Sequence, residues 1–146
     1  MQFRPSTDSA SRLEPVSLPN ASGFSGGVWA LFRNAPRGDL RFGNLASDGS
    51  VFAGRSSQQW MTIGARSVRD GDQTLLTATA AVNAGWSRSQ QDIVIDLHLH
   101  APATITVGSS GKAISVDGAP VIYREKDGRI ELPSLAKGEH RVRISS

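Results

Sequence analysis

The sequence predicts an all-β fold: an antiparallel two-sheet β-sandwich, of jelly-roll or immunoglobulin-like type, with short helices or none. Three observations predict it. Residues 92–146 form short segments in which apolar and polar residues alternate, as in strands that bury one face. Asp-Gly pairs, a strong signal for hairpin turns, occur four times, at residues 48–49, 70–71, 117–118 and 127–128. No segment shows a helical period beyond a turn or two.

The composition is compatible with one domain. A chain of 146 residues can bury an ordinary core, and the apolar fraction of 38% suits strands with one buried face. With no cysteine, disulfides and cysteine-bound metals are excluded. No apolar run approaches the roughly 18 residues of a membrane-spanning helix, so we predict no membrane partner. Residues 1–18 are too polar for a signal peptide, which leaves a cytoplasmic protein or an extracellular or periplasmic one whose signal was removed.

The first part of the chain divides into an irregular lead-in, residues 1–27, and the start of a single β-sandwich domain, residues 28–146. Ser, Pro, Asn and Gly dominate the end of the lead-in. Short alternating or β-branched segments between Gly- and Pro-bearing turns then predict strands at 28–33, 39–43, 50–53, 59–64, 66–69 and 74–81. Residues 84–91 are expected to form a polar connection.

The strand expected next, residues 92–100, has the clearest pattern. Its apolar residues fall on one face, because side chains alternate along a strand, and that face should meet the core. These residues are Ile93, Ile95, Leu97 and Leu99. Pro102 ends the strand, since it lacks the N–H that a ladder needs. A meander should follow, with strands at 104–107, 113–116, 120–123, 129–132 and 140–144.

The net charge of +3 comes entirely from the first 91 residues, which hold nine Arg and no Lys against six acids. The planar guanidinium suits carboxylate, sulfate or phosphate, so an anionic partner is one interpretation and an ordinary solvated surface is the other. Nucleic acid is not predicted as a partner, because aromatic residues are not interleaved with these arginines on one strand face.

Three stretches near the C-terminus carry a family resemblance: I-x-V-D-G-x-P-V at 114–121, D-G-R-I-x-L-P at 127–133 and K-G-E-H-R-V-R-I at 137–144. They resemble the accessory β-sandwich domains, often C-terminal, of bacterial polysaccharide lyases and some glycoside hydrolases. The resemblance implies a secreted bacterial module that accompanies an enzyme rather than the catalytic unit itself.

Among the three tryptophans, Trp86 is the expected contact for a sugar ring, because it stands in the polar connection beside Arg88. Arg66 and Arg69 are further candidate contacts. Trp29 and Trp60 lie within apolar alternations and are expected in the core. The other interpretation of Trp86 is a cap over one end of the sandwich.

The alternative chemistry is enzymatic. Asp96, His98 and His100 share one strand face, and the two histidines could join a metal site if His140 or an acid on a neighbouring strand gave a third ligand. The other interpretation of this face is a polar surface stripe. A lyase-type elimination would use Tyr123 or a histidine as base, with an arginine to neutralise a uronate. No Gly-x-Ser-x-Gly nucleophile motif and no phosphate-binding loop occurs.

The leading hypothesis is a non-catalytic module that binds an acidic polysaccharide or supports a catalytic domain, with no cofactor. The alternatives are a lyase-like or metal-dependent enzyme that uses the His/Tyr/Arg set, and a structural or protein-interaction sandwich. The sequence favours no particular oligomeric state.

Overall fold

The computed structural model describes residues 14–35, 38–90, 92–109, 111 and 113–145, and its regular structure is antiparallel β-sheet. The prediction of an all-β antiparallel fold is therefore confirmed. No helix long and apolar enough to cross a membrane occurs within these residues.

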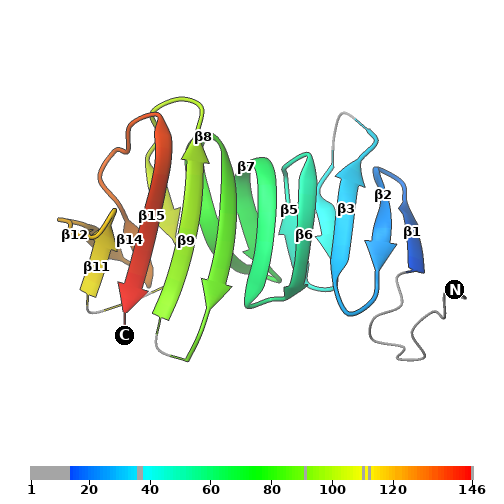
Figure 1. Cartoon of the computed structure of the whole chain (residues 1–146), viewed down its shortest axis with the longest axis horizontal. Helices are drawn as coiled ribbons and strands as arrows, with labels where there is room; N and C mark the ends of the chain where they lie inside the picture. The colour runs from blue at the N-terminus through cyan, green and yellow to red at the C-terminus, as the bar shows by residue number, and fades with distance from the viewer. Residues whose placement is uncertain (1–13, 36–37, 91, 110, 112, 146) are drawn as a thin grey trace, which may run out of the picture.

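One hydrogen-bonded network joins fifteen strands of the described chain (Figure 1). Its main path, in spatial order, contains β1 (Glu14–Leu18), β2 (Ala21–Ser25), β3 (Trp29–Arg33), β6 (Val51–Ser56), β7 (Gln59–Asp70), β8 (Gln73–Arg88), β9 (Asp92–Leu99), β15 (Gly138–Ser145), β11 (Ala113–Val116) and β12 (Ala119–Pro120). Two branches leave it: β5 (Leu45–Ser47) and β4 (Leu40–Phe42) beside β7, and β10 (Ile105–Val107), β14 (Arg129–Glu131) and β13 (Arg124–Lys126) beside β8.

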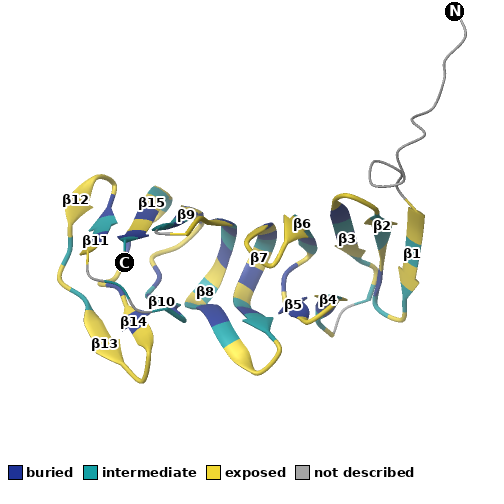
Figure 2. Ribbon diagram, turned by 90° about the horizontal axis from the view of Figure 1, so that it is seen from below, coloured by how far each residue is buried: buried dark blue, intermediate teal, exposed yellow. Residues whose placement is uncertain are grey.

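The two longest strands, β7 and β8, carry the sheet from one layer to the other (Figure 2). Residues 59–62 of β7 pair with 84–87 of β8. With β1, β2, β3, β6, β9, β15, β11 and β12 they form the layer that we call the front arm. Residues 67–70 of β7 pair with 73–77 of β8 beside β5 and β10, in what we call the back arm.

The turn from one arm to the other follows from register shifts between the two strands at residues 62–67. Gly64 lies there with a φ of +68°, a backbone conformation that residues with a Cβ rarely adopt. Its N–H donates to the side-chain oxygen of Asn83 at 3.0 Å. Such bulges bend strands sharply, and strands that bend in this way can form the corner between two packed layers.

The division into two separate sheets is not found, because both layers are joined through β7 and β8. The sequence predicted two strands, 59–64 and 66–69, in place of β7, and one strand, 74–81, in place of β8. Gly64 ended one predicted strand, and residues 84–91 were assigned to a polar connection. In the structure Gly64 is a bulge inside β7, and β8 continues to Arg88.

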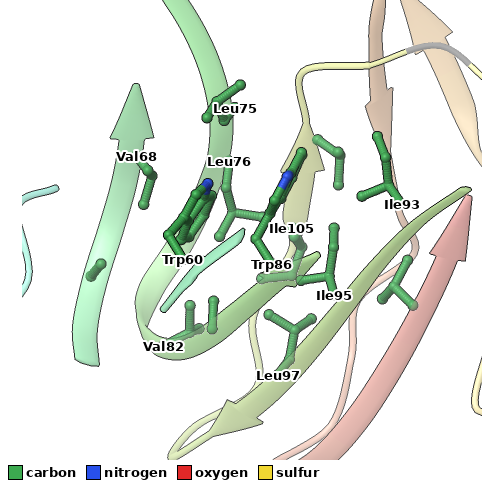
Figure 3. Packing of buried hydrophobic residues seen from close by; sticks show 14 of the residues in the cluster. Trp60, Val68, Leu75, Leu76, Val82, Trp86, Ile93, Ile95, Leu97 and Ile105 are labelled. Carbon is green, nitrogen blue, oxygen red and sulfur yellow. The ribbon is translucent and has the colours of Figure 1, made fainter. Parts of the chain in front are cut away.

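The core lies between the two arms and forms one apolar cluster. Figure 3 shows Leu76 and Ile105 of the back arm pointing toward Trp86 and Ile95 of the front arm. The four aliphatic side chains predicted for the core face of β9 are all buried, with at most 5% of any one exposed. That prediction is confirmed, and it fixes which face of the front arm meets solvent.

A row of aromatic rings crosses the core from β4 to β8. Trp29 stacks on Phe42 with ring centroids 4.9 Å apart, and Phe52 meets it edge-on. Phe52 then meets Trp60 edge-on, and Trp60 stacks on Trp86 at 5.3 Å. Aromatic pairs of both geometries stabilise by about 0.5–1.5 kcal/mol beyond the area that they bury.

The chain before residue 28 departs from the irregular lead-in that we expected. Residues 1–13 lie outside the described residues, but β1 and β2 form a hairpin that pairs with β3. Pro15 stands in β1 and Pro120 in β12, the two end strands of the main path. Proline lacks an N–H and so discourages a further strand from pairing at a sheet edge.

The four Asp-Gly pairs differ from one another, and at 70–71 only the glycine has positive φ. At 117–118 and 127–128 both residues have positive φ, as the predicted type I′ turns require. At Asp48 the carboxylate instead accepts the backbone N–H groups of Arg66 and Ser67, at 2.8 and 3.0 Å.

Replacing Trp86 by alanine should destabilise the fold by about 3–5 kcal/mol, because it removes a buried ring from the aromatic row. Phe24→Ala is the matched control; this ring is 50% exposed, and its loss should change the free energy of unfolding by about 0.5 kcal/mol or less. Urea unfolding followed by circular dichroism measures both. Equal losses for the two variants would contradict this assignment, and Trp86→Phe should lose less than Trp86→Ala if the alanine variant fails to fold.

Candidate functional site

The solvent face of the front arm carries an uninterrupted row of directly paired residues across six strands. In order from β3 to β15 they are Ala30, Ala53, Met61, Gly85, Asp96 and Arg141. The row passes from small and apolar to charged. Since neighbouring strands lie about 4.8 Å apart, its five steps span roughly 24 Å.

Two adjoining open depressions follow this row, with volumes of about 640 and 510 Å³. Both are lined by Met61, Gly85 and Asp96, so together they form one elongated hollow, which we call the face trough. Its floor is low because the side chains of Ala30 and Ala53 are small and Gly85 has none. A Cβ at Gly85 would have its nearest neighbours in Asp96, at 4.0 Å, so the space above this glycine is open.

One end of the trough is mainly apolar. Val28 and Met61, which line it, are 41% and 44% exposed. Phe24 lies opposite Ala30 on the neighbouring strand and extends the apolar surface beyond the trough. Arg55 is the cation at this end.

The other end is polar. The guanidinium of Arg141 donates from Nε to Asp96 at 2.7 Å. His98 lies beside Glu139, with Nδ1 and Oε1 3.9 Å apart, and its ring meets the ring of His100 edge-on at 4.8 Å. These groups provide donors and acceptors in an open, hydrated setting.

His140 closes this end beneath the turn between β11 and β12. Its Nδ1 lies 2.7 Å from Oδ2 of Asp117, and its Nε2 lies 2.7 Å from the carbonyl oxygen of Ala136. An ionised carboxylate and a carbonyl only accept hydrogen bonds, so both ring nitrogens donate when both contacts form, and the imidazole is then positively charged.

The contact shifts the pKa values of both His140 and Asp117. The hydrogen bond to Asp117, followed by the one to Ala136, raises the pKa of His140 above its ordinary value. The backbone N–H of Arg141, at 2.8 Å from Oδ1, lowers the pKa of Asp117, and the contact with His140 lowers it further.

The predicted sugar contacts are not brought together. The expectation that Trp86 is exposed is wrong, since the ring is 3% exposed against Trp60. Trp29 and Trp60 are buried as predicted. Arg66 and Arg69 lie in the second half of β7, whereas Arg88 lies at the end of β8 that pairs with the first half of β7. Arg69 is also held by Asp39, at 3.0 Å.

The polar stripe predicted on β9 is present, with Asp96, His98 and His100 exposed on one face. Asp96 is engaged by Arg141, and within the described residues no group of three or more His, Cys, Asp or Glu side chains is placed to hold a metal ion. Tyr123 is half-buried and lines a depression with Arg124 and Glu131, which is separate from the one that His98 lines.

The apolar end of the trough was not predicted from the sequence. Phe24 and Phe32 are 50% and 46% exposed, and they lie on the same face of the β2–β3 pair. The alternation around Phe24 was hidden by Ser and Gly, and the exposed face of β3 could be found only once its partners on both sides were known.

The stability of the fold should depend on pH through Asp117 and His140. Because the pKa of His140 is raised in the folded state, this residue stabilises the fold fully below about pH 6.5. That stabilisation is lost as the pH rises through the folded-state pKa. Because the pKa of Asp117 is lowered in the folded state, this residue stabilises the fold fully above about pH 4. That stabilisation is lost as the pH falls through the folded-state pKa of Asp117.

Urea unfolding across this range should therefore show greatest stability between about pH 4 and 6.5, with a change of about 1 kcal/mol or less, because Asp117 is half exposed. Asp117→Asn should flatten the alkaline decline, whereas His98→Gln should retain it. An alkaline decline of undiminished size in Asp117→Asn would contradict the role of this pair.

No protein-family model matches the chain, and no curated protein matches it.

Proposed function

We propose that this chain is a non-catalytic binding module that holds a polysaccharide across the solvent face of its front arm. The observation that carries the proposal is the face trough, an open hollow along a row of about 24 Å in which Ala30, Ala53 and Gly85 leave the floor low. A polymer lying along such a trough can place apolar ring faces on Met61 and the alanines and its hydroxyls near Asn83, His98 and Arg141.

The charges in the trough support recognition by shape and hydroxyl groups rather than by net charge. Asp96 is paired with Arg141, and Asp117 with His140. Arg55 and Glu139 lie one at each end and have opposite signs, and Glu139 is 3.9 Å from His98. The acidic glycan expected from the sequence relied on Trp86 and on arginines that lie elsewhere, so a neutral glycan is the better ligand for this face.

The resemblance of residues 114–144 to accessory domains of polysaccharide-degrading enzymes supports the same class of function. Modules of that kind act beside a catalytic domain, and a secreted bacterial setting is part of this proposal. We also propose that the two arms, although joined, work as the two layers of a sandwich, with the core between them and the glycan face outside.

The direct experiment is isothermal titration of neutral cello- or manno-oligosaccharides and of oligouronates into the protein. We expect heat from a neutral oligosaccharide, with an affinity that changes little between about 50 and 200 mM salt, because internally paired charges attract no counter-charge. Absence of heat with every glycan would contradict the proposal, and salt-sensitive binding of oligouronates alone would contradict the neutral ligand.

Gly85→Gln tests the site. The new side chain should fill the floor of the trough and weaken binding at least about tenfold, or about 1.4 kcal/mol. Ala81→Gln is the matched control, because Ala81 is an exposed small residue on the same strand that does not line the trough. Equal affinities for the two variants would place the glycan elsewhere.

A second function, docking to a catalytic domain, is favoured by one observation. Phe24 and Phe32 are 50% and 46% exposed on the same face of the β2–β3 pair, next to the apolar end of the trough that Val28 lines. Contiguous exposed apolar groups mark interaction surfaces more often than chance. Phe24→Ser with Phe32→Ser should then abolish co-elution with a polysaccharide-degrading domain and leave glycan affinity unchanged, whereas Gly85→Gln should do the reverse.

A further inference from the structure

The connection between β14 and β15 is held by hydrogen bonds at two successive residues, Leu135 and Ala136. Leu135 exchanges two backbone hydrogen bonds with Ala103, at 2.9 and 3.0 Å. The next residue, Ala136, gives its carbonyl oxygen to His140 at 2.7 Å. β15 then begins at Gly138, which has a φ of +125°. Residues 136–137 are therefore a short strap between a fixed point and a glycine that tolerates unusual backbone angles.

The two hydrogen bonds of His140, to Asp117 and to Ala136, differ in strength and each needs its own N–H. A neutral imidazole has one N–H and can donate to Asp117 or to Ala136, but not to both. A hydrogen bond to a carboxylate is roughly twice as strong as one to a neutral acceptor. Loss of one proton should therefore retain the contact with Asp117 and release the carbonyl of Ala136.

The turn that carries Asp117 does not depend on this proton. Its backbone N–H donates to the carbonyl oxygen of Arg141 at 2.8 Å, and its Oδ1 accepts the N–H of Arg141. Deprotonation therefore frees only one side of the contact. We propose that His140 is a proton-operated latch, which fastens the strap of residues 136–137 to β15 when charged and releases it when neutral.

The other ionisable groups around this depression have partners of their own. Arg141 is held by Asp96 at 2.7 Å, and Glu139 lies near His98 at 3.9 Å. Asp117 is the one charged group in contact with the imidazole of His140 within the described residues. The latch should respond to that carboxylate above all others.

The latch lies at the polar end of the face trough, which Asp117, His140 and Arg141 line. Because His140 itself lines this end, loss of its proton would change the charge and the number of N–H donors that the trough presents there. This consequence rests on the proposed function, and it makes glycan affinity depend on pH through a residue that is separate from the floor of the trough.

The latch can be tested by NMR without any glycan. The chain has three histidines, so three imidazole signals titrate at most. The signal of His140 should titrate above the ordinary midpoint of about 6.5, and the backbone resonances of Ala136 and Lys137 should shift with the same midpoint. Those of Ala103 and Leu135 should stay in place.

Three variants separate the latch from a general effect of pH. Asp117→Asn should lower the midpoint of His140, and His140→Gln should abolish the titration of Ala136 and Lys137. His98→Gln should leave both unchanged. A midpoint at or below about 6.5 in the wild type, or strap resonances that do not follow His140, would overturn the proposal.

A separate experiment is isothermal titration of the oligosaccharide at pH values on either side of the midpoint of His140. If the strap titrates but no glycan binds, the latch stands and the proposed function fails. If a glycan binds with equal affinity to the wild type and to His140→Gln at both pH values, the link between the latch and the trough is overturned.

Discussion

The bend of β7 and β8 is the constraint on which the rest of the molecule depends. Both strands belong to the front arm at one end and to the back arm at the other, so the position of each arm is set by the same pair. The register shifts around Gly64 provide the bend, and the side chain of Asn83 satisfies the N–H that the bulge leaves unpaired. Burial of the aliphatic and aromatic side chains between the arms then stabilises the folded sheet.

The same pairing that closes the core creates the exposed face. Because residues directly opposite one another share a face, placing Trp60 and Trp86 in the core forces Met61 and Gly85 to the solvent side of the adjacent positions. The hollow above Gly85 is thus a consequence of register. The polar end has the same origin, since Asp96 lies opposite Gly85 on one side and Arg141 on the other.

The sequence predicted local structure well wherever one short period governed it. The core face of β9, the hairpin turns at Asp117 and Asp127, and the burial of Trp29 and Trp60 all follow from alternation or from backbone sterics at Asp-Gly. The errors occurred where long-range pairing overrides composition. Ser87 and Arg88 suggested a loop, but their strand is held between β7 and β9. The contact of His140 with Asp117 joins residues 23 apart, and no local pattern could have shown it.

The positions of the three tryptophans have a practical consequence for spectroscopy. Trp29, Trp60 and Trp86 all belong to the aromatic row, and Trp60 and Trp86 stack with their planes only 10° apart. Indole emission therefore reports on the junction of β3, β6, β7 and β8. It carries no signal of its own from residues 92–145, which contain no tryptophan. A fluorescence melting curve of this protein therefore reports mainly on this junction, and a local opening confined to β11–β14 would leave the emission unchanged.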